Sequence, residues 1–200
     1  MDAQTLRDAP RVLHTARLTL ESPRVEHAQA FVDMLNASLV GWRFIGWGQL
    51  PRDLAWAEQF SRRGAQYVED GEDLIYTVFD TASRACIGRI DLHSFDFDAP
   101  RCEIGYAGHV QHAGRGLMRE AAMAVIELGF GLGCERIEAF SDLRNQRAIV
   151  FAIGLGFESE GVVRSRERDP QGLLCDQVML ARLKPAAATA ADQTAMSVPL

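Results

Sequence analysis

The sequence predicts a single domain of mixed α and β structure (α+β), and three observations support this. With 200 residues, 48% of them hydrophobic, the chain can bury one sizeable core. Segments with alternating apolar residues are interleaved with segments in which apolar residues recur at helical spacing. Turn-forming residues separate these segments. We expect the domain to span residues 11–184, between a flexible stretch at 1–10 and a disordered, Ala-rich tail at 185–200.

The first strand and the first helix are expected near the N-terminus. Residues 12–21 alternate imperfectly between apolar and polar side chains, which indicates a strand. Ser22 and Pro23 then supply an N-cap and a proline at the first helical position. The helix that follows places a set of apolar residues near one face, namely Val25, Ala28, Phe31, Val32 and Leu35.

A second helix is expected after a segment, 41–48, that has too many glycines for a regular element and is rich in aromatic residues. Pro51 opens this helix, which continues to about Tyr67. Its inward-facing residues are expected to be Leu54, Ala57, Phe60 and Ala65.

Three strands and a third helix come next. The strands are expected at 73–80, 85–95 and 101–110, and the first two are joined by a turn at 81–84. The helix is expected at 116–130.

The last third of the domain is expected to hold a strand at 135–141 and a helix at 144–154. Residues 157–168 and 173–183 indicate a closing hairpin, with its turn at 169–172.

The connection between the strand at 101–110 and the helix at 116–130 contains the most informative motif, Gln111–Met118. Gly114 and Gly116 let the backbone turn tightly and expose its N–H groups. The start of the helix adds unpaired N–H groups and the positive end of the helix dipole. These features predict a binding loop for a phosphate or pyrophosphate. The motif lacks the Lys-Ser/Thr of a P-loop and the third glycine of a dinucleotide fingerprint.

The pattern Gln-x-x-Gly-x-Gly, followed by Leu-Met, resembles the acetyl-CoA pyrophosphate loop of the GNAT superfamily of N-acetyltransferases. A second motif agrees, because Asn145 begins an Asn-x-x-Ala sequence and Gly156 and Phe157 follow at the GNAT spacing. Gly156 also suits a helix C-terminus that needs positive φ, whereas Asn145 could serve only as a helix N-cap. The resemblance covers residues 11–183 and is most specific over 101–157.

The resemblance implies a GNAT fold, with a central, twisted, mostly antiparallel sheet of about seven strands and helices on both faces. In that fold two central strands splay apart, and the arm of the co-substrate enters the gap. The implied co-substrate is acetyl-CoA, and no metal is implied. The residues implied to hold acetyl-CoA are Gly108, His109, Val110, Gln111, Gly114, Arg115, Gly116, Leu117, Met118 and Asn145.

Acetyl transfer to an amine needs a group that accepts a proton from the acceptor. Glu103 is the first candidate, because several GNAT enzymes carry a glutamate early in this strand, and Asp91 is the alternative, acting through a water. The competing interpretation is that Glu103 only forms a structural pair with Arg101, Arg89 or another neighbour. The chain departs from the family at the group that protonates the thiolate, because Ala152 and Ala148 stand where relatives have Tyr or Ser. Tyr106 or a water is then expected to serve.

Within the superfamily, the segments 15–20, 104–106 and 114–121 resemble the RimJ/RimL-like branch, which acetylates the N-termini of ribosomal proteins. The expected acceptor is therefore a primary amine, first a protein or peptide N-terminus, with a polyamine, amino acid or aminoglycoside as the alternative. A non-catalytic acyl-CoA-binding module is the alternative outside the enzymes. The 41–48 segment is expected to line the acceptor side, or to form a hydrophobic lid or the contact of a homodimer.

Composition limits the partners. A net charge of −6 argues against non-specific nucleic-acid binding. Without an apolar run of membrane length or a signal pattern, the protein is expected to be cytoplasmic and to have no membrane partner. The four scattered cysteines predict reduced thiols rather than structural zinc. The glycine-rich stretch 129–133 follows a helix, which indicates a helix C-terminus rather than a phosphate loop.

Overall fold

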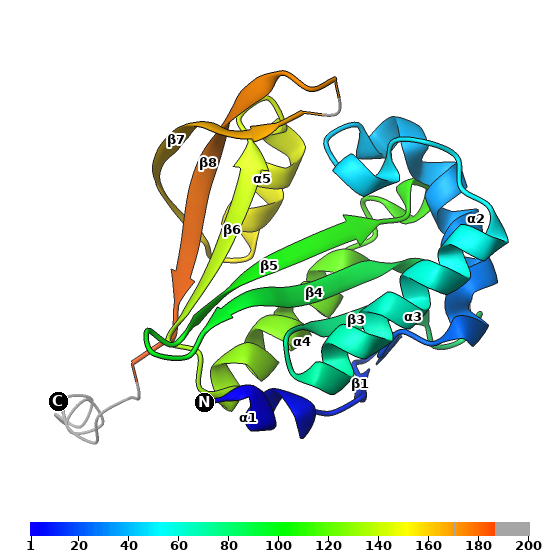
Figure 1. The fold of residues 1–200 in the computed structure, drawn as a ribbon, viewed down its shortest axis with the longest axis horizontal. Coiled ribbons are helices and arrows are strands. Elements are labelled where there is room, and N and C mark those ends of the chain that lie inside the picture. Colours follow the sequence, from blue (N-terminus) through cyan, green and yellow to red (C-terminus); the bar gives the residue numbers. More distant parts are fainter. Residues whose placement is uncertain (170, 187–200) are drawn as a thin grey trace, which may run out of the picture.

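A computed structural model describes residues 1–169 and 171–186. Its centre is one open sheet of eight strands in the order β1-β2-β3-β4-β5-β6-β8-β7 (Figure 1). Neighbouring strands are antiparallel except β5 and β6, which are parallel. The mixed fold with a mostly antiparallel sheet is therefore confirmed, with one strand more than expected. Among the described residues, no helix is long and apolar enough to cross a membrane.

The elements follow the expected order. The strands are β1 (Val12–His14), β2 (Leu18–Glu21), β3 (Leu74–Asp80), β4 (Cys86–Asp96), β5 (Arg101–Gly108), β6 (Arg136–Asp142), β7 (Glu158–Arg168) and β8 (Leu174–Leu183). The α-helices are α1 (Ala3–Arg7), α2 (Ala28–Ser38), α3 (Leu54–Asp70), α4 (Leu117–Leu132) and α5 (Gln146–Gly154). The predicted tail at 185–200 lies outside the described residues from 187 onward.

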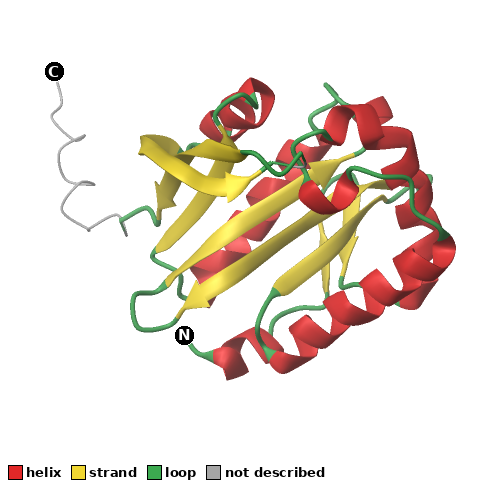
Figure 2. Cartoon of the chain, turned by 45° about the horizontal axis from the view of Figure 1, so that its top comes forward, coloured by secondary structure: helices red, strands yellow, loops and turns green. Residues whose placement is uncertain are grey.

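Helices cover both faces of the sheet (Figure 2). Helices α4 and α5 lie on one face, where Ile90 of β4 and Ile104 of β5 join the largest apolar cluster. Helices α2 and α3 lie on the other face, where Phe31 and Trp42 pack against Ala107 of β5. Because successive residues of a strand point to opposite faces, β4 and β5 send alternate side chains into these two layers. The face under α2 and α3 therefore receives the odd-numbered residues of β5.

The predicted first strand is in fact a hairpin of two strands. Thr15 forms the turn between them, because its N–H donates to the Leu18 carbonyl (2.9 Å) and its hydroxyl accepts from the Leu18 N–H (3.1 Å). The prediction of one strand over 12–21 was wrong because a side-chain-stabilised turn leaves the apolar alternation of the sequence almost unbroken. This hairpin accounts for the eighth strand.

The predicted cap of the first long helix was also wrong. Helix α2 begins at Ala28 after a 3₁₀ turn at Val25–His27, and no side chain caps it. The Ser22 N–H instead donates to the Arg11 carbonyl (2.8 Å), which extends the pairing of the N-terminal hairpin. The expected apolar face is present nonetheless, since the buried residues of α2 include Ala28, Phe31, Val32 and Leu35.

Helix α3 begins three residues later than expected. The Asp53 side chain accepts a hydrogen bond from the Trp56 N–H (2.8 Å) and is the N-cap, so Pro51 precedes the helix. Leu54, predicted to face inward, is 41% exposed as a consequence. The buried residues of α3 are Ala57, Ser61, Gly64 and Val68.

The first ten residues, predicted to be loose, contain a short helix. Asp2 and Thr5 form a capping box at the start of α1. Leu6 is fully buried in the main core and fixes this helix against the domain. A single apolar residue with a cap was too weak a pattern for sequence reasoning to predict this.

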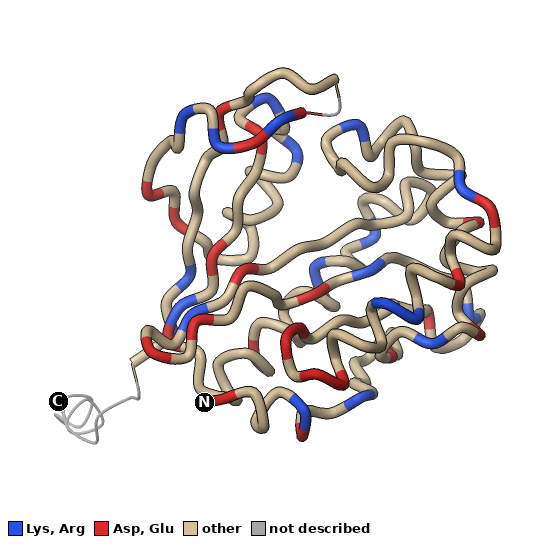
Figure 3. Tube along the Cα trace, in the orientation of Figure 1, with Lys and Arg blue, Asp and Glu red and all other residues tan. Residues whose placement is uncertain are grey.

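Strands β5 and β6 splay apart soon after they meet. Their parallel pairing covers only three positions, Arg101–Glu103 with Arg136–Glu138, at the lower left of Figure 1. Acidic and basic residues alternate where these strands converge (Figure 3). Beyond this closed end the strands diverge, which opens space between the two halves of the sheet.

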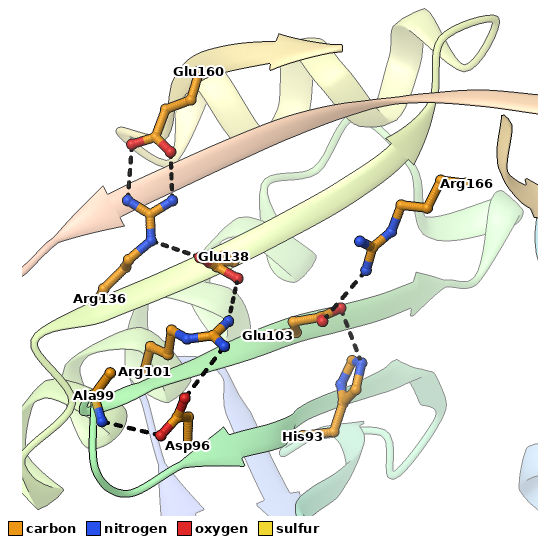
Figure 4. A network of polar contacts seen from close by, with 9 residues as sticks. All are labelled: His93, Asp96, Ala99, Arg101, Glu103, Arg136, Glu138, Glu160 and Arg166. Carbon is orange, nitrogen blue, oxygen red and sulfur yellow. Dashed lines mark hydrogen bonds and ion pairs between the residues drawn. The ribbon is translucent and has the colours of Figure 1, made fainter. Parts of the chain in front are cut away.

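A ladder of ion pairs crosses the closed end of the splay (Figure 4). The buried carboxylate of Glu138 accepts hydrogen bonds from Arg136 (2.6 Å) and Arg101 (3.2 Å). Arg101 also contacts Asp96 (3.3 Å), and Arg136 also contacts Glu160 on β7. The ladder thus ties β4, β5, β6 and β7 together at the point from which the splay opens.

Candidate active site

The loop between β5 and α4 has the backbone that an anion-binding loop requires. Gly114 (φ +78°) and Gly116 (φ +74°) both adopt the left-handed conformation that favours glycine. Within the described part of the chain, the backbone N–H groups from Gly114 to Arg119 donate to no protein acceptor. The last of these groups belong to the first turn of α4, where the helix dipole is positive. The loop therefore presents a row of free donors to an anion.

A first cavity of about 550 Å³ lies along this loop and the start of α5. It is lined by most of the residues predicted to hold acetyl-CoA: Gly108, His109, Val110, Gly114, Gly116, Leu117, Met118 and Asn145. Gln111 and Arg115, also predicted, do not line it. The Arg115 side chain turns aside to donate to His112 Nδ1 (2.9 Å). Arg119 and Arg147 do line the cavity and were missed, although cations beside a predicted phosphate loop were a usable signal.

Contacts from the N-terminal hairpin fix the loop. Glu120, in the first turn of α4, accepts hydrogen bonds from the Thr15 hydroxyl (2.6 Å) and the Arg17 N–H (2.8 Å). The Arg17 side chain pairs with the same carboxylate (2.6 Å) and donates to the Arg115 carbonyl (3.1 Å). Burial alone would raise the pKa of Glu120, but these donors lower it below its ordinary value. The carboxylate therefore stays charged and holds the loop to the first strands.

A second, larger cavity of about 750 Å³ lies on the opposite face of β5, under α3 and the β7–β8 hairpin. Carboxylates outnumber arginines in its lining. The acidic residues are Glu72, Asp73, Asp91, Glu103, Asp142, Glu167 and Asp169, and the arginines are Arg89 and Arg168. Such a lining favours a cationic ligand over an anionic one.

The two cavities meet across the splayed strand. Six residues line both of them: Phe44, Ile45, Tyr106, Ala107, Asn145 and Ala148. The Asn145 side chain accepts from the Ala148 N–H (3.3 Å), so it caps α5 and also lies at this junction. A ligand in each cavity could therefore bring its reactive end to the same point.

Both candidate bases face the second cavity. In the β4–β5 register Asp91 lies opposite Gly105 and His93 lies opposite Glu103, so the two carboxylates share one face. A Cβ on Gly105 would lie 2.7 Å from Asp91 Oδ2, so only glycine leaves room for the carboxylate on the strand. Sequence reasoning missed His93, which follows Asp91 at the two-residue spacing of a strand face.

His93 lies between the two predicted carboxylates. Its Nδ1 is buried 2.9 Å from Asp91 Oδ2, in an ion-pair contact that lacks hydrogen-bond geometry, and its Nε2 is 3.7 Å from Glu103 Oε2. Glu103 also contacts Arg166 of β7 at 3.6 Å, as Figure 4 shows. The expected partners of Glu103, Arg101 and Arg89, pair with other carboxylates.

Burial and charge shift the pKa values of these groups in opposite directions. Burial alone would raise the pKa of Asp91, but His93 and Arg89 outweigh it and bring the pKa below its ordinary value. Burial alone would lower the pKa of His93, but the Asp91 carboxylate raises it above its ordinary value. Glu103 and Asp73 add to this rise. These shifts in pKa favour the charged form of both groups, the carboxylate of Asp91 and the imidazolium of His93.

Tyr106 lies where the cavities meet. Its hydroxyl donates to the Ala148 carbonyl (3.3 Å), and burial raises its pKa to about 12. Tyr106 therefore stays protonated at neutral pH and is able to donate its proton. Ala152 is buried and carries no hydroxyl that could serve in its place.

The aromatic segment 41–48 contributes to both the core and the cavities. Trp42 is buried, and its indole N–H donates to the Gly108 carbonyl (2.9 Å) at the end of β5. Trp47 lines the second cavity and packs against Phe60 and Trp42. The segment is thus part of the core and a packed wall of both cavities.

Comparisons with known proteins identify the family and the fold of the chain. A family model described as an acetyltransferase (GNAT) domain matches residues 17–158. The uncharacterized N-acetyltransferase p20 of Bacillus licheniformis is 31% identical over 116 residues, which are 58% of this chain and 65% of that protein. The chain thus matches less than two thirds of the length of that relative.

Solved structures share the fold. The microcin C7 self-immunity acetyltransferase MccE, solved with acetyl-CoA and AMP, superposes with a TM-score of 0.79 at 18% identity, over 85% of this chain and 94% of that one. The ribosomal L7/L12 α-N-protein acetyltransferase RimL, solved with coenzyme A, gives a TM-score of 0.78 at 18% identity, over 86% and 97% of the chains. At these identities the likeness is one of fold.

Proposed function

Because the chain belongs to the GNAT acetyltransferase family, we propose that it transfers the acetyl group of acetyl-CoA to a primary amine. The observation that carries this proposal is the meeting of two cavities at the splayed strand. One cavity begins at an anion-binding loop, and most of the charged residues that line the other are acidic. The first lining favours the anionic pyrophosphate of acetyl-CoA, and the second favours an ammonium ion. Direct attack of the amine on the thioester requires that the reactive ends of both ligands reach one point.

The first cavity is the proposed site of acetyl-CoA. The free N–H groups of Gly114 to Arg119 would bind the pyrophosphate, and Arg119 and Arg147 add positive charge nearby. The apolar walls at Leu117 and Met118 suit the pantetheine arm. MccE was solved with acetyl-CoA and RimL with coenzyme A, which supports acetyl-CoA as the co-substrate.

The second cavity is the proposed site of the amine. Two carboxylates are proposed to contact the reacting amino group. Glu103 is the first candidate for the base, and Asp91 is the alternative. Both lie on the cavity face of the sheet, where a carboxylate can attract the ammonium ion and accept its proton. Tyr106 is the proposed proton donor to the leaving thiolate, because it lies at the junction and stays protonated. Backbone N–H groups near the end of β5 would polarise the thioester carbonyl.

We propose a protein or peptide N-terminus as the first acceptor to test. The similarity of fold to RimL supports this choice, and the cavity, with a volume of about 750 Å³, has room for more than a single amino group. Small amines such as polyamines and aminoglycosides are the second class, because the carboxylate-rich lining suits them as well.

Thiol release from acetyl-CoA with a panel of amines tests the proposal. Peptides with one internal lysine are supplied with either a free or a blocked N-terminus, beside polyamines, amino acids and aminoglycosides. We expect acetylation of the free N-terminus and no reaction of the blocked peptide. Turnover with a small amine alone would reject the peptide acceptor and keep the reaction. Acetyl-CoA binding without product from any amine would instead indicate a non-catalytic module.

A further inference from the structure

We propose that His93 accepts the proton of the acceptor amine, with Asp91 positioning the imidazole and Glu103 binding the ammonium ion. This inference rests on the proposed function and deepens it, because it separates binding of the cation from removal of its proton. The observations that carry it are the position of His93 between the two carboxylates and its place on the wall of the acceptor cavity.

The ion-pair contact with Asp91 orients the imidazole by charge rather than by a hydrogen bond. The negative charge beside Nδ1 favours the tautomer with its proton on that nitrogen, which leaves the lone pair on Nε2. Asp91 is suited to this role because it stays ionised, held by His93 at 2.9 Å and Arg89 at 3.3 Å. Gly105 lies opposite Asp91 in the register and leaves space for the carboxylate. The sheet itself therefore sets the direction of Nε2.

The gap between His93 and Glu103 fits an ammonium ion. Nε2 and Glu103 Oε2 are 3.7 Å apart, which is too long for a hydrogen bond between them. One nitrogen atom can nevertheless lie about 2.9 Å from both, within hydrogen-bond reach of each. An acceptor ammonium in that position would donate one proton toward the carboxylate and another toward the imidazole. Only the imidazole has an ordinary pKa close to neutral, which is where a base is most effective.

Charged groups from several elements surround the imidazole and determine its titration. They are Arg89 and Asp91 on β4, Glu103 on β5, Asp73 just before β3, and Arg166 on β7 beyond Glu103, with Tyr67 of α3 in the same cavity wall. The carboxylates prevail, so the pKa of His93 is raised above its ordinary value. The neutral base forms only above that raised value. Turnover should therefore fall as the pH is lowered through it.

In this step the ammonium ion gives one proton to His93 Nε2, and the neutral amine attacks the carbonyl carbon of the thioester. The carbon–sulfur bond breaks as the amide forms, and the sulfur leaves as a thiolate. The second proton that the nitrogen loses ends on this sulfur. The imidazolium later releases its proton to solvent, so one ammonium ion and one acetyl-CoA give one amide, one thiol and one released proton.

The test compares kcat between pH 5.5 and 9.5, at saturating alkylamine, for the wild type, His93→Gln, His93→Ala, Asp91→Asn and Glu103→Gln. We expect kcat of the two His93 variants to be about 10²–10³-fold lower, and the fall of kcat at low pH, the acidic limb of the pH profile, to disappear. The Kd for acetyl-CoA should stay within about twofold of the wild-type value. Added imidazole should restore His93→Ala at least about tenfold. With an aromatic amine as acceptor, which is already neutral at pH 7, kcat of the His93 variants should fall only slightly. Glu103→Gln should mainly raise the KM of the cationic acceptor and keep the limb.

A titration of the wild-type His93 ring by NMR checks the positioning role without relying on a loss of activity. Its pKa should fall in Asp91→Asn, because the carboxylate that raises it is gone. The proposal is overturned if His93→Gln keeps the wild-type kcat and its decrease at low pH. It is also overturned if this decrease disappears in Glu103→Gln instead. A wild type that turns over no amine overturns the proposed function as well, which distinguishes the two failures.

Discussion

Replacing Gly116 by Asn or by Asp, two side chains of the same shape, tests whether the loop binds the pyrophosphate of acetyl-CoA. Its φ of +74° is a conformation that Asn and Asp tolerate better than other residues, and a Cβ there would meet only Arg17 Nη2, at 3.7 Å. Gly116→Asn and Gly116→Asp therefore carry the same backbone strain, about 1 kcal/mol. They differ by one negative charge beside the row of free N–H groups. Any difference between them in acetyl-CoA affinity reports that charge.

The size of the difference follows from Coulomb's law. A carboxylate about 6 Å from a pyrophosphate repels each of its two charges by roughly 1.4 kcal/mol at an effective dielectric constant of about 40. The sum, about 3 kcal/mol, corresponds to roughly 100-fold in Kd. Arg17, whose Nη2 lies 3.7 Å from the position of the added Cβ, would offset part of this repulsion. We therefore expect the Asp variant to bind about 10–100-fold more weakly than the Asn variant.

Calorimetric titration with coenzyme A measures both Kd values. Raising the salt from 0.1 M to 1 M shortens the screening length from about 10 Å to about 3 Å, so the gap between the variants should narrow. Acetyl-pantetheine, which has no pyrophosphate, should react equally well with both variants. Equal Kd values for coenzyme A in the two folded variants at low salt would refute the assignment of the loop.

The remaining predictions concern the closed end of the splay and the leaving group. Replacing Glu138 by Gln should lower the free energy of unfolding in urea by about 2–3 kcal/mol, because its side chain is only 5% exposed between Arg136 and Arg101. Replacing Glu160 by Gln should lower this free energy by clearly less, because its side chain is 42% exposed. Equal losses would mean that burial of Glu138 adds nothing. Tyr106→Phe should lower kcat about tenfold, and by the same factor at every pH from 6 to 9, because burial keeps this phenol protonated throughout. Steady-state kinetics measure this loss, and an unchanged kcat would show that Tyr106 is not the proton donor.

Local motifs made part of the site predictable. Gly114 and Gly116 indicate a turn because they lack a side chain, and Asn145 caps a helix. A short stretch of sequence is enough to predict each of these local structures. The alternation along β4 and β5 placed Asp91 and Glu103 on strands correctly, since strand faces repeat every two residues. The mixed fold followed from the order of such segments.

Features that depend on distant contacts could not be predicted in this way. The role proposed for His93 depends on its register opposite Glu103, which is set by the whole β4–β5 pairing. The loop is held by a hydrogen bond from Thr15 to Glu120, 105 residues away in the sequence. The same Thr15 breaks the first strand into a hairpin, because a side-chain hydrogen bond can redirect a backbone without changing its apolar pattern.

The splay also bears on aggregation. Unpaired strand edges invite pairing with other chains, and proteins usually shorten, charge or distort the edges that face outward. Here β1, at one outer edge, has three residues, and β7, at the other, carries many charged side chains and two register shifts against β8. The edge of β5 that opens beyond Glu103 lies inside the molecule, between the two cavities. The protein can thus keep free backbone groups for a small ligand at a place that a strand of another protein cannot easily reach.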